Sequence, residues 1–282
     1  MKEVTIRDLT IGRGQSVKIM GVINLSPESF YKGSIKKSRE QLITTVETME
    51  KAGADIIDIG AMSTAPYLET QISPEEEIKR ITETISIIKE NSKVPISIDT
   101  TRATTAKVGL ENKADLINDI SGFTTDPQMP RIIAKAKKPI IIGAYKLERF
   151  KGHPIERINQ SFEESLTLAK KAGISKKQII LDPDIGFHRK TSLPWYQVDA
   201  CILKKLRKFI EKFQKPICIG LSRKSFIGHY LDLKDPEERL FGSLGATCLA
   251  FLNGANIIRT HDVEETKQTI TIIEKILQEK NC

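Results

Sequence analysis

Short apolar runs alternate with longer segments of helical period along almost the entire chain, and this alternation is what most constrains the fold. The runs are rich in isoleucine and valine on both faces, which is typical of strands in a parallel sheet that is covered by helices. Each run is followed by a segment with the period of a helix. There are eight such runs, at residues 17–24, 54–60, 94–99, 114–119, 138–145, 178–182, 215–221 and 255–260.

Eight strand–helix units are the number at which a parallel sheet closes on itself, so we predict a single (β/α)8 TIM barrel domain over residues 1–282. The alternative is an open, doubly wound sheet. The barrel is favoured because the runs are evenly spaced and no glycine-rich GxGxxG turn follows the first of them. One helix start is especially clear, since Ser73 can cap it, Pro74 can open it and Glu76 lies in its first turn.

Charge and composition limit the classes of partner. The chain has 44 Lys and Arg against 36 Asp and Glu, spread along its length, and only 6% aromatic residues. This pattern favours small anionic molecules and argues against nucleic acid as a partner. The four cysteines form no CxxC pair, and no apolar run reaches the length of a membrane span. We therefore expect a soluble, cytoplasmic protein that has no membrane partner.

Polar residues gather at the carboxyl ends of the predicted strands, where barrel enzymes hold their active sites. Asn and Asp at such positions also cap helices, but capping does not require amides, carboxylates and cations to converge on one mouth. The combination fits a flat heterocycle with N–H, amino and carbonyl groups and an anionic arm. The residues are Asn24, Asp58, Gly60, Asp99, Asn118, Asp119, Tyr145, Asp182, Ser222, Lys224, Arg259 and His261.

Seven segments, in the same order along the chain, resemble dihydropteroate synthase, the folate-pathway enzyme of the pterin-binding superfamily. They are INLSPESF, DIIDIGAMST, ISIDT, LINDISG, ILDPDIGF, GLSRKSFIG and IIRTHDV, between residues 23 and 263. The resemblance implies a transferase that joins 6-hydroxymethyl-7,8-dihydropterin diphosphate to an arylamine and releases diphosphate. The amine would be para-aminobenzoate or a phosphorylated ribosyl-aniline, as in tetrahydromethanopterin synthesis.

The resemblance also implies roles for the matching residues. The pterin ring would be bound by Asp99, Asn118, Asp182 and Lys224. The diphosphate would be bound by Asn24, Arg259 and His261, with the cofactor Mg²⁺ held between Asn24 and the phosphates. The arylamine would lie beside Phe30, Thr64, Pro66 and Ser222, whereas Arg223 would be structural or peripheral. The family further implies a homodimer formed through the last helices.

The chain departs from the family pattern at several positions. Lys32 replaces an Asp of the first loop, and Met62 and Ala65 replace a Glu and an Arg of the second. Asp184 stands where the LDPG turn has its glycine, and the GAYK segment at 143–146 replaces an MHM element. The residues that are expected to bind the pterin ring are retained, whereas several residues of the loops that are expected to cover the amine are replaced.

Two explanations of these departures stay open. In the first, the enzyme uses an amine with an extra anionic group, which would be held by basic residues, namely Lys32, Lys36, Lys37, Arg39, His188, Arg189 and Lys190. In the second, it is a tetrahydropterin-dependent methyltransferase that acts on a corrinoid protein or another acceptor. The SRKSFIG and RTH segments favour the synthase, because the methyltransferases generally lack both. A binding module without catalysis ranks last.

Overall fold

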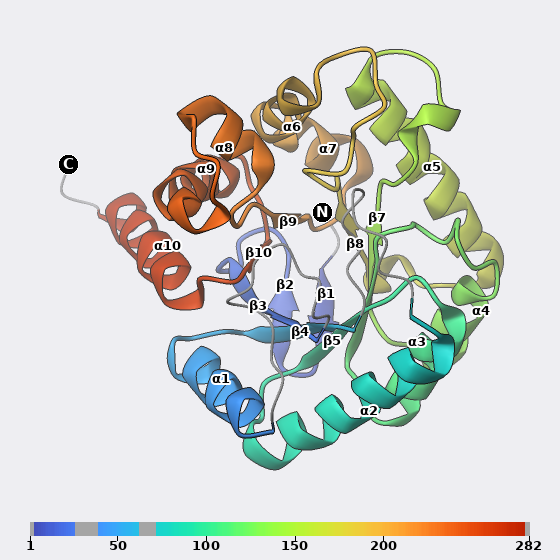
Figure 1. Ribbon diagram of the computed structural model, residues 1–282. Helices are drawn as coiled ribbons and strands as arrows, with labels where there is room; N and C mark the ends of the chain where they lie inside the picture. The colour runs from blue at the N-terminus through green and yellow to red at the C-terminus, as the bar shows by residue number, and fades with distance from the viewer. Residues whose placement is uncertain (1–2, 26–38, 62–71, 280–282) are drawn as a thin grey trace.

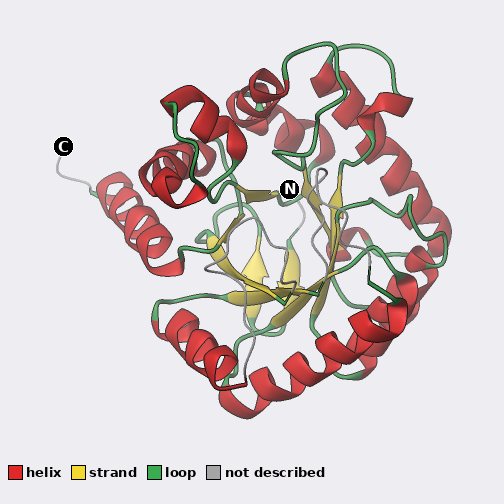
Figure 2. Cartoon of the chain, in the orientation of Figure 1, coloured by secondary structure: helices red, strands yellow, loops and turns green. Residues whose placement is uncertain are grey.

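Eight parallel strands form a barrel that is ringed by helices (Figure 1). The computed structural model describes residues 3–25, 39–61 and 72–279. The strand order is β8–β7–β6–β5–β4–β3–β10–β9, and the outer strands meet where the backbone N–H of Leu181 donates to the carbonyl of Pro216 over 3.0 Å. Figure 2 shows the strands at the centre and the helices around them. The predicted (β/α)8 barrel is confirmed.

Each barrel strand lies within one of the eight predicted runs. The strands are β3 (Lys18–Asn24), β4 (Ile56–Gly60), β5 (Ile96–Asp99), β6 (Leu116–Asp119), β7 (Ile140–Gly143), β8 (Ile179–Asp182), β9 (Cys218–Gly220) and β10 (Ile257–Thr260). The register is parallel throughout, so all eight strands end at the same mouth.

The helices follow the strands as the sequence pattern indicates. They are α1 (Arg39–Lys51), α2 (Pro74–Asn91), α3 (Ala103–Glu111), α4 (Met129–Ala136), α5 (Pro154–Ala172), α6 (Trp195–Lys204), α7 (Leu206–Phe213), α8 (Ser225–Leu231), α9 (Leu240–Leu252) and α10 (Val263–Gln278). Short 3₁₀ turns are η2 (Leu147–Arg149), η3 (Lys176–Gln178) and η4 (Pro236–Arg239). Helix α2 begins as predicted, because Ser73 Oγ accepts from the N–H of Glu76 over 3.2 Å. No helix in the described parts of the chain is long and apolar enough to cross a membrane.

A small antiparallel hairpin, β1 (Val4–Ile6) and β2 (Leu9–Ile11), was not expected from the sequence. Each of its strands has three residues, too few to show a period. Its apolar side chains pack on residues inside the barrel, so that the hairpin covers the end opposite the mouth. The cluster contains Val4, Ile6, Ile11, Met20, Ile56, Leu116, Ile141, Ile180, Cys218 and Ile257.

Side chains alternate between the inside and the outside of the barrel along each strand. In β4, Ile57 and Ile59 pack toward the helices and Ile56 packs inside, so Asp58 also points inside. The same two-residue step leads from the inner residues Leu116, Ile180 and Ile257 to Asn118, Asp182 and Arg259. The interior therefore changes from apolar to polar just before the strands reach the mouth.

Candidate active site

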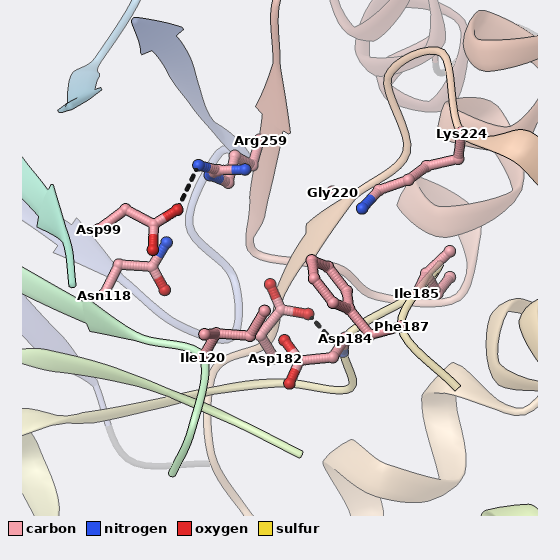
Figure 3. A pocket seen from close by; sticks show the side chains of 10 residues that line it. All are labelled: Asp99, Asn118, Ile120, Asp182, Asp184, Ile185, Phe187, Gly220, Lys224 and Arg259. Carbon is pink, nitrogen blue, oxygen red and sulfur yellow. Dashed lines mark hydrogen bonds and ion pairs between the residues drawn. The ribbon is translucent and has the colours of Figure 1, made fainter. Parts of the chain in front are cut away.

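A pocket lies at the carboxyl ends of the strands and contains about 370 Å³ of empty space, part of it open to solvent. Its lining comes from segments far apart in the sequence (Figure 3). The lining residues are Asp99, Asn118, Ile120, Asp182, Asp184, Ile185, Phe187, Gly220, Lys224 and Arg259. The structure thus brings together all four residues that we expected at the pterin ring, and it adds Arg259 to them.

The strand register explains why there is room for a ligand. Gly143 pairs with Asp182 across β7 and β8, and Gly220 pairs with Arg259 across β9 and β10. Partners in a parallel register point to the same face, so both glycines stand at inward positions beside a polar side chain. A Cβ on Gly220 would meet no atom nearer than 3.9 Å, so this position is open, whereas the position at Gly143 is occupied by Asp184 Oδ2 and the carbonyl oxygen of Ile120. Asp99 pairs with Asn118 in the same way across β5 and β6, which places two hydrogen-bonding groups side by side.

Arg259 joins two carboxylates inside the barrel. Its Nε donates to Asp58 Oδ2 over 2.7 Å and its Nη2 donates to Asp99 Oδ2 over 2.9 Å, the second being visible in Figure 3. Burial raises the pKa of Asp99 to about 7, and Arg259 opposes that rise. Burial acts against the charge of Arg259, but Asp58 and Asp99 outweigh it and raise the pKa of the guanidinium. The pair of carboxylates therefore holds a permanent cation at the floor of the pocket.

Asp58 is a site residue to which sequence reasoning assigned no role. It is fully buried, and its Oδ2 also accepts from Asn118 Nδ2 over 3.3 Å. Asp58 therefore positions both Arg259 and Asn118. The sequence did contain a signal for this role, because Asp58 lies in an apolar run, two residues beyond Ile56 and therefore on the same inward face. An unpaired charge at such a position would be costly, so a buried partner for Asp58 could have been expected.

Asp182 and Lys224 face the pocket with opposite charges. Asp182 Oδ1 accepts from the backbone N–H of Asp184 over 2.8 Å. Burial raises the pKa of Asp182 to about 6, opposed by this N–H and by Lys224. Burial and Arg259 lower the pKa of Lys224, whose Nζ lies 4.6 Å from the centre of the Phe187 ring. A ligand between Asp182 and Lys224 would meet an acceptor on one side and a donor on the other.

His261 lies between two of the other predicted residues. Asn24 Nδ2 is 3.3 Å from His261 Nε2, and Ser222 Oγ is 3.0 Å from His261 Nδ1. Burial and the neighbouring cations, Arg259 first, lower the pKa of His261 to about 3, so the imidazole is neutral at physiological pH. A side chain added at Gly60 would place its Cβ 3.9 Å from both Asn24 Oδ1 and Asp99 Oδ2, so Asn24 lies next to the pocket.

Arg223 has the structural position that we expected. Its guanidinium and the carboxylate of Asp262 form an ion pair in which both side chains are about nine-tenths buried. Asp262 Oδ2 also accepts from Ser222 Oγ over 3.1 Å. The SRKSFIG and RTHDV segments are thereby joined, and Ser222 is held against His261. Whether Ser222 also contacts the amine stays a prediction.

The prediction that His188, which follows β8, helps to bind an anionic group of the amine is wrong. This residue is buried, its Nε2 lies 2.8 Å from the carbonyl oxygen of Pro183, and burial lowers its pKa to about 4. It is therefore a neutral core residue. Arg189 donates to Ser225 Oγ over 2.6 Å and stacks 4.1 Å above the centre of the Trp195 ring.

Phe30, Thr64 and Pro66 lie outside the described residues, as do Lys32, Lys36, Lys37, Met62 and Ala65. Arg39 begins α1 and pairs with Glu90 at 2.5 Å on the surface.

Comparisons with known proteins agree with this architecture. The profile of the family described as pterin binding enzyme matches residues 20–261. The dihydropteroate synthase of Synechocystis sp. is 38% identical over 275 residues, covering 93% of this chain and 91% of that protein. The enzyme of the same name from Bacillus subtilis is 35% identical and covers 92% and 88%.

Solved structures are similar over the whole barrel. Dihydropteroate synthase of Yersinia pestis in a sulfonamide complex superposes with a TM-score of 0.88 at 29% identity, covering 98% of this chain and 100% of that one. The Coxiella burnetii enzyme in complex with pteroic acid gives a TM-score of 0.83 at 32% identity, covering 99% of both chains. Because the profile, the relatives and the fold agree over nearly the full length, the chain belongs to the pterin-binding enzyme family and, within it, to the dihydropteroate synthases.

Proposed function

We propose that this enzyme transfers the dihydropterinylmethyl group of 6-hydroxymethyl-7,8-dihydropterin diphosphate to the nitrogen of an arylamine and releases diphosphate. The observation that supports this most strongly is the convergence of Asn118, Asp182 and Lys224 on one pocket at the barrel mouth. A scaffold protein would gain nothing from so many buried polar groups, each of which is costly without a partner.

The pocket has the hydrogen-bonding groups that a pterin ring requires. An ionised Asp182 can accept two parallel bonds from a ring N–H and its neighbouring amino group, an arrangement that is strong because it is charge-assisted. Asn118 offers both a donor and an acceptor, and the Lys224 ammonium donates to a carbonyl or ring nitrogen. Hydrogen bonds from the ligand stabilise the ionised form of Asp182, whose pKa burial has raised to about 6.

The diphosphate would bind on the side of Arg259, His261 and Asn24. Asp58 and Asp99 accept from Nε and from one N–H of Nη2 of Arg259, so that both N–H groups of Nη1 and the second N–H of Nη2 could donate to phosphate oxygens. A neutral His261 serves as a hydrogen-bonding group and not as a cation.

The chemistry that this arrangement supports is dissociative. The C–O bond to diphosphate breaks with its electron pair on the leaving group, and positive charge develops on the pterin methylene. The carboxylates of Asp99 and Asp182 lie where they can stabilise that charge, while Arg259 stabilises the charge on the leaving group. The arylamine lone pair then forms the C–N bond, and the nitrogen loses a proton. No residue has to activate the amine, because an aniline is unprotonated at neutral pH.

Mg²⁺ is the metal that this reaction implies. Among the described residues, no group of three or more His, Cys, Asp or Glu side chains is arranged to hold a metal ion. Asn24 nevertheless fits, because its Oδ1 lies beside the pocket and Mg²⁺ commonly takes few protein oxygens together with substrate phosphates. When bound between Asn24 and the diphosphate, the ion would neutralise charge on the leaving group.

The identity of the amine rests on the loops before α1 and α2. Para-aminobenzoate and a phosphorylated ribosyl-aniline both carry an anionic group, and the second carries it on a longer arm. Phe30, Thr64 and Pro66 are the residues that we propose beside the amine, together with Ser222.

Diphosphate release is the direct test of the function. The purified protein is mixed with the pterin diphosphate, Mg²⁺ and each amine in turn, and diphosphate is measured. We expect release that requires both Mg²⁺ and an amine, and that is absent in Lys224→Ala. Absence of release with either type of amine would remove this proposal, and methyl transfer from a methyl-tetrahydropterin to a corrinoid protein would replace it.

We also propose a homodimer formed through the last helices. Large apolar side chains are exposed on α8, α9 and α10, which lie next to one another in Figure 1. Phe241 is 83% exposed, and Leu249 and Leu252 follow it on the same face of α9. Patches of this kind mark interaction surfaces. Dimerisation would cover the patch, which also contains Tyr230, Leu231, Ile272, Ile276 and Leu277.

Sedimentation measures the assembly. We expect a species of twice 31.6 kDa for the wild type and a monomer for Phe241→Asp. Thr104→Asp, on the exposed surface of α3, is the matched control and should remain dimeric. A wild type that sediments at 31.6 kDa would refute the dimer.

A cytoplasmic location is the last part of the proposal. Cys201, Cys218 and Cys248 are free thiols, and burial raises the pKa of Cys218 well above its ordinary value. Unpaired, buried cysteines are typical of proteins in a reducing compartment. Fluorescence of a tagged protein in its source cells would test this.

A further inference from the structure

Asp184 is a third carboxylate that lines the pocket, besides Asp99 and Asp182, and its position is unusual in two ways. Its backbone φ is +54°, in the left-handed region that glycine adopts without strain and other residues do not. Its side chain is buried, and Oδ2 has no hydrogen-bond partner among the described residues. Glycine at this position would remove both the backbone strain and the cost of burying an oxygen without a partner. The aspartate side chain is therefore expected to have a compensating role.

The side chain of Asp184 points into the space that Gly143 leaves empty. A Cβ on Gly143 would lie 2.5 Å from Asp184 Oδ2 and 2.2 Å from the carbonyl oxygen of Ile120. The carboxylate therefore fills the inward position across from Asp182, and it faces the same pocket as Asp182 and Asn118 (Figure 3).

The turn itself does not require the Asp184 side chain. The bond that ties this residue to Asp182 uses the backbone N–H of Asp184, which glycine would also supply. No ion pair joins Asp184 to Lys224 within the described part of the chain. Burial and the charge of Asp182 raise the pKa of Asp184, and the charge of Lys224 opposes that rise. The described residues therefore leave this buried oxygen available to a group of the ligand.

We propose that Asp184 contacts the bound heterocycle, and that its buried Oδ2 accepts a hydrogen bond from an N–H group of the ring. This inference rests on the proposed function. It makes Asp184 a specificity-determining residue, because a ring that presents only acceptors to this oxygen would leave it unpaired. Discrimination against ligands that lack a matching donor is strong at such buried positions.

The test compares the affinity of 6-hydroxymethylpterin for the wild type, Asp184→Gly and Asp184→Asn by titration calorimetry. Glycine and asparagine both tolerate a positive φ, so the turn is kept. We expect Asp184→Gly to bind at least about tenfold more weakly, because glycine leaves a buried N–H group of the ring without its acceptor. Asp184→Asn keeps an uncharged acceptor and should show a smaller loss.

Asp232→Gly is the matched control, since Asp232 also has a φ of +54° but lies exposed after α8. It should bind the pterin as the wild type does. If the wild type binds and both variants at position 184 bind within twofold of it, the inference is overturned and the proposed function stands. If the wild type itself does not bind the pterin, both are overturned. If Asp184→Gly does not fold, Asp184→Asn alone is compared with the wild type, and binding within twofold of the wild type again overturns the inference.

Discussion

The ion pair of Arg223 and Asp262 allows a stability prediction that can be worked out from the structure. Arg223 Nε lies 3.0 Å and Nη2 lies 2.6 Å from the carboxylate, and Nη1 donates to the carbonyl of Glu237 over 2.7 Å. Both side chains are about 90% buried, so solvent screens the pair little. The network joins the end of β9 to α10 and to η4.

Replacing either partner with alanine leaves the other as a buried charge without its counter-charge. Such losses cost about 3–5 kcal/mol. We therefore expect Arg223→Ala and Asp262→Ala each to lower the free energy of unfolding by about 4 kcal/mol. In a chain of this size the melting temperature would fall by roughly 8 °C, at about 2 °C for each kcal/mol. The double variant should lose only about 5–6 kcal/mol, because it leaves no unpaired charge, and the coupling energy would then be about 2–3 kcal/mol.

The assay is urea unfolding followed by circular dichroism. The urea concentrations at the midpoint are compared between variants whose unfolding free energies depend on urea with the same slope. Arg39→Ala is the control, because Arg39 and Glu90 form an ion pair of 2.5 Å whose side chains are 53% and 54% exposed. That exposed pair should contribute less than about 1 kcal/mol. Equal losses for Arg39→Ala and Arg223→Ala, or strictly additive losses in the double variant, would refute the argument from burial.

Three further predictions concern the pocket and its surroundings. Lys224→Ala should abolish pterin binding in calorimetry while the circular dichroism spectrum stays native; unchanged affinity would show that the ring binds elsewhere. Asp58→Asn removes one of the two anionic partners of Arg259 and should weaken binding of the pterin diphosphate about tenfold, the effect of one charge-assisted hydrogen bond. The pKa of His188 is lowered from 6.5 to about 4, so its contribution to stability is complete above pH 6.5 and is lost as the pH falls toward 4. The stability difference between the wild type and His188→Gln should thus shift by on the order of 2–3 kcal/mol between pH 7 and pH 4.5 in urea unfolding, and a constant difference would contradict this.

The barrel could be predicted because its strands are buried on both sides and therefore consist of nearly unbroken apolar runs. Periodicity alone located all eight of them, with boundaries within a few residues. The β1–β2 hairpin was missed because it is short and its burial depends on a barrel that is assembled from the rest of the chain. Long-range contacts of this kind leave no local pattern.

The candidate site could be predicted in part. Asn118, Asp182 and Lys224 were expected together, and they line one pocket. Asp58 was not assigned a role, since an aspartate near a strand end is equally typical of a helix cap. His188 was misplaced because no period fixes the direction of a loop side chain, and here it turns into the core.

The hairpin at the closed end of the barrel also affects the order in which the chain can fold. Val4 and Ile6 are synthesised well before Ile257, yet they share a cluster with this residue of the last barrel strand. A nascent chain must therefore keep the apolar side chains of the hairpin exposed at least until β10 has been made. Contacts over such separations are slow to form, so the β1–β2 hairpin would be open to chaperone binding for longer than the strands that pair with their neighbours in sequence.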